Sequence, residues 1–142
     1  MVLLLKWNCY LNLNLLEIGI LNGESISSWI EYFPYANIYC IDTFQRIPSK
    51  NIPILKNKRV SYKCVDSTSS ESSKKVRDWG VKFDIIIDDG LHTPDANKQT
   101  FINFFPMLEK NGLYFIEDFW PLFKMSETEK DHKFLKKHSK LW

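Results

Sequence analysis

The segment DIIIDDGLH, residues 84–92, runs from three consecutive isoleucines into two aspartates, a glycine and a histidine. A β-branched run bounded by glycine predicts a strand covered on both faces, as in the middle of a parallel sheet. A second apolar segment, LYFIED, ends in Glu117 and Asp118. Carboxylates gathered in a partly dry crevice hold protons unless a cation neutralises them, and oxygen ligands suit a hard ion such as Mg²⁺. If the two strands are neighbours, the acids meet at one edge of the sheet.

Strand-like and helix-like segments alternate along the chain and would position these acids. A helix after Gly23 is indicated by apolar residues at helical spacing, namely Ile26, Trp29, Ile30 and Phe33. The other predicted elements are strands at 14–20, 37–42, 59–66, 84–89 and 113–118, a weak serine-rich helix within 67–80, a helix from Thr93 and Pro94 to Asn111 and Gly112, and a last helix from about Ser126.

This alternation predicts an α/β fold, a doubly wound and mainly parallel sheet of five strands, in one domain spanning residues 1–142. In such sheets the ligand binds beyond the carboxyl ends of the strands, near the switch point beside the first strand. Every predicted strand ends in an acid or in a glycine turn: Glu17 and Gly19, Asp42, Asp66, Asp88 and Asp89, Glu117 and Asp118.

The composition excludes several classes of protein. A net charge of +2 on 142 residues gives no basic field for nucleic acid. The three cysteines form no CxxC pair, which argues against a disulfide framework or zinc site and for a reducing cytoplasm. Polar residues interrupt the apolar N-terminal segment, so it is too short to span a membrane and shows no cleavage site.

The glycine turn differs from a dinucleotide site, because Leu21 and Glu24 stand where G-x-G-x-x-G requires its second and third glycines. Instead, EIGILNGES followed by YCID, KCVD, DIIIDDGLH and GLYFIEDF resembles the class I S-adenosylmethionine-dependent methyltransferases. Within them the chain looks most like the macrolide-sugar and rhamnosyl O-methyltransferase branch, from about Leu15 to Phe119. The resemblance implies a Rossmann-like sheet.

The resemblance also implies a binding site for S-adenosylmethionine. Asp42, at a strand end, would accept hydrogen bonds from both ribose hydroxyls, as its spacing from Gly23 also allows. Glu17 would lie near the methionine amino group, and Asp66 with Ser67 beside the adenine. The remaining implied cofactor residues are Gly19, Gly23, Ser25 and Asp88. Three alternatives stay open: Asp42 as a residue that only terminates its strand, Asp66 as a solvated turn residue, and Glu17 as a structural hydrogen-bond partner of the glycine turn.

For the chemistry, the resemblance implies that Asp89, Glu117 and Asp118 hold Mg²⁺, which chelates vicinal sugar hydroxyls. His92 would take the proton of the attacking hydroxyl as general base. The alternative is that these acids only orient the ammonium group of the cofactor and cap the next helix, with His92 a capping or surface residue.

Family members usually carry two further strands after the fifth and helices before the first, which this chain would lack. A compact viral or phage version and a fragment are both consistent with that. The predicted activity is O-methyl transfer to a sugar or other small hydroxyl compound. The alternatives are a cofactor-binding module without transfer activity and an enzyme that cleaves S-adenosylmethionine. A fifth strand at the sheet edge, apolar on both faces, also predicts a homodimer or higher oligomer.

Overall fold

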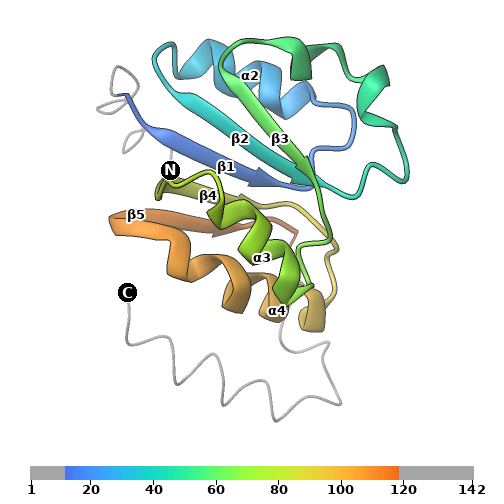
Figure 1. Ribbon diagram of the computed structural model, residues 1–142, viewed down its shortest axis with the longest axis vertical. Coiled ribbons are helices and arrows are strands. Elements are labelled where there is room, and N and C mark those ends of the chain that lie inside the picture. Colours follow the sequence, from blue (N-terminus) through green and yellow to red (C-terminus); the bar gives the residue numbers. More distant parts are fainter. Residues whose placement is uncertain (1–11, 119–142) are drawn as a thin grey trace.

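The computed structural model describes residues 12–118, which form a five-stranded sheet with helices on both faces (Figure 1). The strands are β1 (Asn14–Ile18), β2 (Asn37–Asp42), β3 (Val60–Cys64), β4 (Phe83–Asp88) and β5 (Leu108–Ile116). The helices are α2 (Glu24–Tyr32), α3 (Ser70–Arg77) and α4 (Pro94–Phe104), with 3₁₀ turns η1 (Ser49–Asn51), η2 (Pro53–Lys56) and η3 (Phe105–Met107).

The strand order is β3-β2-β1-β4-β5, and each of the four neighbouring pairs is parallel. The chain reverses its direction of winding at β1, which lies between β2 and β4. The predicted doubly wound sheet is therefore confirmed. The fourth and fifth strands are neighbours, so the condition for their terminal acids to meet is fulfilled.

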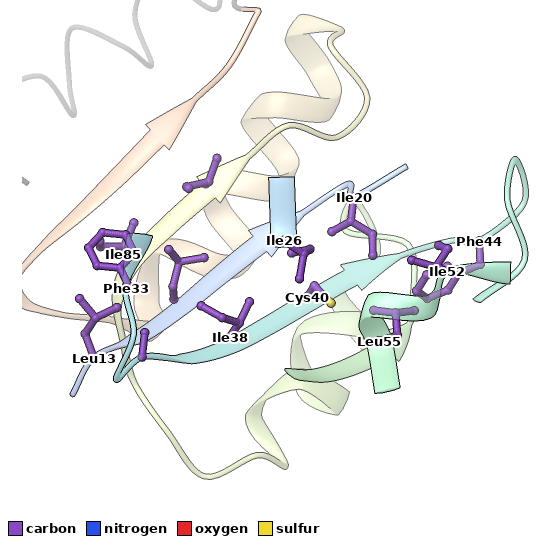
Figure 2. Packing of buried hydrophobic residues seen from close by; sticks show 13 residues of the cluster. Leu13, Ile20, Ile26, Phe33, Ile38, Cys40, Phe44, Ile52, Leu55 and Ile85 are labelled. Atoms are coloured by element: carbon purple, nitrogen blue, oxygen red, sulfur yellow. The ribbon is translucent and has the colours of Figure 1, made fainter. Parts of the chain in front are cut away.

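Successive side chains of the central strands point to opposite faces of the sheet and pack into two separate hydrophobic cores. Leu15 and Ile85 pack on the face covered by α2, together with Ile26 of that helix and Phe33 directly after it. Figure 2 shows Ile26, Phe33 and Ile85 in this core. Leu16 and Ile86 pack on the other face against α3 and α4. Both faces are covered, which explains the unbroken apolar sequence of β4.

The prediction for residues 105–112 was wrong. Helix α4 ends at Phe104, a 3₁₀ turn containing Pro106 follows, and β5 begins at Leu108. Pro106 has no N–H to continue the helical ladder. Leu108 still packs beside the core that Phe104 enters, so the apolar spacing was read correctly but assigned to the wrong element. Asn111 has φ 71° inside β5, where the register with β4 shifts.

The remaining predictions agree with the structure except at element ends, and one lies outside it. The first and third strands are shorter than predicted, and the predicted helix from Ser126 lies outside the described residues. None of the helices within residues 12–118 has the length and apolar character needed to cross a membrane.

Arg59, just before β3, closes the carboxyl end of α2. Its guanidinium donates hydrogen bonds to the carbonyl oxygens of Ile30 and Phe33, both at 2.7 Å, and of Ala36 at 3.2 Å. These bonds satisfy carbonyls at and beyond the helix end and attach α2 to the sheet.

Candidate active site

A cavity of about 600 Å³ opens at the carboxyl ends of the strands. It is lined by residues that follow β1, β2, β3 and β4, among them the predicted residues Gly19, Asp42, Asp66, Ser67 and Asp89. The other predicted residues do not line it: Glu17, Gly23, Ser25, Asp88, His92, Glu117 and Asp118. Sequence reasoning missed the lining residues Thr43, Gln45 and Arg46, which lie in a loop without a recognisable pattern, and Leu91, which lies within the DIIIDDGLH segment between the predicted site residues.

Two glycines of the turn after β1 are needed because other parts of the protein come close to them. A Cβ on Gly19 would lie 2.3 Å from the carbonyl oxygen of Asp89, and on Gly23 it would lie 2.7 Å from Ile54. Both have φ near +80°, a conformation that favours glycine. Gly19 therefore lets the loops after β1 and β4 meet at the cavity, whereas Gly23 packs against η2.

The carboxylate of Asp42 is held in place by the backbone. It accepts hydrogen bonds from the N–H groups of Ile20 at 2.9 Å, Leu21 at 3.3 Å and Phe44 at 2.7 Å. A carboxylate offers about four acceptor sites, so about one stays free for a ligand. This side chain is fixed at the cavity wall, between the turn after β1 and the loop after β2.

Glu17 lies buried beneath the turn, with 2% of its surface exposed. It accepts hydrogen bonds from the hydroxyl of Ser25 and the indole N–H of Trp29. Burial raises the pKa of Glu17 to about 7; these two bonds oppose the rise, and Asp89 and Glu117 add to it. Ser25 thus supports Glu17 instead of lining the cavity, and Trp29, predicted only as core, also binds a carboxyl group.

The loop after β3 forms another wall. Asp66 accepts hydrogen bonds from the backbone N–H of Thr68 at 2.9 Å and from its hydroxyl at 2.7 Å, which closes a tight turn. The hydroxyl of Ser67 lies 2.9 Å from that of Thr100 on α4. This turn leaves both predicted residues at the cavity.

Three chemically active side chains meet beside the cavity. Asp89, His92 and Asp118 each place one ligand atom within 4.8 Å of the others, and His92 Nε2 lies 3.5 Å from Asp89 Oδ1. Burial raises the pKa of Asp89, and the charge of Asp118 adds to the rise. The pKa of Glu117 is raised by burial, then by Asp89 and Asp118. Two carboxylates converging on one point fit a divalent cation; Glu117 lies outside the converging set.

Asp88 takes the opposite side of the sheet from Asp89, as strand alternation predicts. It is buried, and burial raises its pKa to about 6. Its Oδ1 accepts a hydrogen bond from the N–H of Gly90 at 3.3 Å, while within residues 12–118 its Oδ2 has no partner. Asp88 therefore lies behind Gly90 and outside the cavity wall.

Residues 16–119 match the family described as "Methyltransferase domain", and the chain belongs to that family. Its relatives include the L-olivosyl-oleandolide 3-O-methyltransferase of Streptomyces antibioticus, 31% identical over 118 residues, and the mycinamicin VI 2''-O-methyltransferase of Micromonospora griseorubida, 30% identical over 112 residues. The matches cover 75% and 74% of this chain but only 29% and 27% of those relatives.

Among solved structures, the fold is similar to the MycE methyltransferase of the mycinamycin biosynthetic pathway, which was determined in complex with Mg and SAH. In one crystal form the TM-score is 0.71 at 25% identity, covering 89% of this chain and 34% of the other. In a second form the TM-score is 0.65 at 28% identity, covering 76% and 28%. The predicted resemblance to class I methyltransferases is confirmed.

Proposed function

We propose that this chain carries out S-adenosylmethionine-dependent O-methyl transfer to a hydroxyl of a small molecule, with a sugar as the acceptor class. The observation that carries the proposal is the cluster of Asp89, His92 and Asp118 beside a strand-end cavity that contains Asp42. Relatives named as O-methyltransferases of sugar-bearing compounds support it.

The cofactor would lie across the switch point at β1. The free acceptor site of Asp42 would take a ribose hydroxyl, and a second hydroxyl would have to displace one of the weaker backbone donors, such as Leu21 at 3.3 Å. Asp66 and Ser67 would flank the adenine. We place Glu17 and Ser25 behind the turn that receives the methionine moiety. Gly19 would be the residue of that turn that lies nearest to the cofactor.

The chemistry would take place at the cluster of Asp89, His92 and Asp118. Asp89 and Asp118, with Glu117 able to join by a side-chain movement, would hold a divalent ion such as Mg²⁺. A bound ion lowers the pKa of a coordinated hydroxyl. His92 would accept the hydroxyl proton while the oxygen forms its bond to the methyl carbon and the carbon–sulfur bond breaks. Asp89, 3.5 Å away, would stabilise the imidazolium that results.

Two other functions would use the same cavity: cofactor binding without transfer, and cleavage of S-adenosylmethionine. Incubation with S-adenosylmethionine, with and without candidate sugars, separates them by mass spectrometry. S-adenosylhomocysteine formed only with an acceptor supports transfer. Methylthioadenosine formed without acceptor supports cleavage, and unchanged bound cofactor supports the binding module.

The roles of the ion and of His92 are tested in the same assay. We expect EDTA to stop transfer and added Mg²⁺ to restore it. We expect His92→Ala and Asp118→Asn each to lower the rate by about 10²-fold or more, the size typical of general acid–base catalysis. Wild-type turnover by both variants in the presence of EDTA would exclude metal-assisted catalysis by this cluster.

A further inference from the structure

Helix α4 buries polar side chains where a sheet-covering helix normally buries apolar ones. Asn97, Thr100 and Asn103, spaced three residues apart, are 5%, 2% and 6% exposed. Burying a polar group is unfavourable unless it is hydrogen-bonded. Two of the three bind the loop after β3, the loop that forms one wall of the cavity.

Both contacts converge on Ser67. The hydroxyls of Thr100 and Ser67 lie 2.9 Å apart, and the Asn103 Nδ2 group donates a hydrogen bond to the carbonyl oxygen of Ser67 at 2.8 Å. Gln99 Nε2 donates to Asn103 Oδ1 at 3.1 Å, which orients the Asn103 amide with its N–H toward the loop. Side chain and backbone of Ser67 are thus fixed from one helix.

Helix α4 begins next to the cluster of Asp89, His92 and Asp118. Thr93 caps α4 by accepting a hydrogen bond from the N–H of Ala96 at 3.3 Å, and it directly follows His92. Thr100 and Asn103 lie 7 and 10 residues further on, or roughly 10 and 15 Å along the helix at about 1.5 Å per residue. Helix α4 therefore sets a fixed distance between His92 and the loop wall.

We propose that Thr100 and Asn103 are positioning residues for the cofactor: they hold Ser67 where the adenine end of S-adenosylmethionine meets it. This inference rests on the proposed function. Without the two contacts the loop loses these hydrogen bonds to α4. It keeps its internal hydrogen bonds, such as those of Asp66 with Thr68, and the bond from the Val65 N–H to the Asp42 carbonyl oxygen at 3.0 Å. Ordering it would then reduce the binding free energy of the cofactor.

The test is calorimetric titration with S-adenosylhomocysteine, which binds without reacting. We expect Thr100→Val to raise Kd about fivefold, the effect of one lost hydrogen bond of about 1 kcal/mol. Thr100→Ser keeps the hydroxyl and should restore Kd to within about twofold. The matched control is Ser73→Ala, which removes a buried hydroxyl that donates to Ser70 O at 2.8 Å in α3, away from the cavity. It should lower thermal stability and leave Kd unchanged.

Wild-type affinity in Thr100→Val, or equal weakening in Ser73→Ala, would overturn the inference. If Thr100→Val does not fold, Asn103→Leu provides the same comparison, since it removes the donor to Ser67 at similar volume. A wild-type protein that does not bind S-adenosylhomocysteine at all would instead refute the proposed function. That outcome is distinct from a binding wild type with unaffected variants.

Discussion

The buried carboxyl group of Glu17 should make the stability of the protein depend on pH in a direction opposite to that of a typical acid. Its pKa is raised from the ordinary 4.5 to about 7, mainly by burial, with Asp89 and Glu117 as the nearby charges that add to the rise. Below pH 4.5 the group is protonated in both the folded and the unfolded chain. Between pH 4.5 and 7 only the unfolded chain ionises, so folding is progressively disfavoured, and above pH 7 the loss is complete.

The size of the effect follows from the two pKa values. A difference of about 2.5 (7 minus 4.5), at about 1.4 kcal/mol for each pH unit, gives a loss of roughly 3 kcal/mol of unfolding free energy by pH 8. Glu17→Gln cannot ionise, and its amide fits the same partners: its oxygen accepts from Trp29, and its N–H₂ donates to Ser25, whose hydroxyl can rotate. We therefore expect the variant to gain about 3 kcal/mol relative to wild type between pH 4.5 and 8.

Urea unfolding of both proteins without ligand, at half-unit steps from pH 4 to 8, measures this difference. Asp88 titrates in both and cancels in the comparison. Glu71→Gln is the matched control: Glu71 is exposed and bound to Lys74, which lowers its pKa. Its stabilising contribution is lost as pH falls, so a small change of opposite sign is expected. Parallel curves for wild type and Glu17→Gln would show that Glu17 ionises freely in the folded protein, and the reasoning from burial would be refuted.

Further predictions concern the cofactor, the fold and the assembly. Asp42→Ala should weaken S-adenosylmethionine binding by about 2 to 3 kcal/mol in calorimetry, because it removes a charged acceptor; wild-type affinity would remove the ribose assignment. Arg59→Met keeps the aliphatic stem but removes three hydrogen bonds from a charged donor, with the Phe33 carbonyl retaining the Ala36 N–H at 3.2 Å, so it should lower the unfolding free energy by about 3 kcal/mol in urea; a loss near zero would show that water replaces the guanidinium. Gly19→Ala should destabilise by at least about 2 kcal/mol in thermal unfolding, because its Cβ would clash with Asp89 and φ is positive; an unchanged midpoint would contradict that close approach. Within residues 12–118, β5 pairs with β4 alone and Leu113 is 41% exposed, so we expect a dimer or larger by light scattering; a monomer mass across micromolar concentrations would contradict it.

The sheet could be predicted because its signals are local. The isoleucines of β4 and the helical spacing in α2 each specify one element, and the short links leave few topologies. The end of α4 could not be predicted from the spacing of apolar residues. Leu108 packs against the same core as Phe104 although it belongs to β5, and a longer helix would have placed an apolar residue there as well. The helix ends before Pro106, which has no N–H for the helical hydrogen bond, although the helical spacing of apolar residues continues to Leu108.

The acids of the site could be located at strand ends, but their division between two faces depends on register. Ile18 is paired with Asp88 across β1 and β4. Asp89 therefore falls on the α2 face, where its charge acts on Glu17, whereas Asp88 acts on Tyr114 in the opposite core. A slip of one residue would exchange these faces: Asp89 would enter the core beside α4, and Asp88 would face α2. The isoleucines alone do not prevent that slip, because identical side chains would fill either core equally well. Contacts on both sides of the apolar run hold the register instead: Asp84 accepts a hydrogen bond from the Asn14 N–H at 2.9 Å, and the Asp89 N–H donates to the Ile18 carbonyl oxygen at 2.9 Å. These contacts determine which carboxylate faces the cluster.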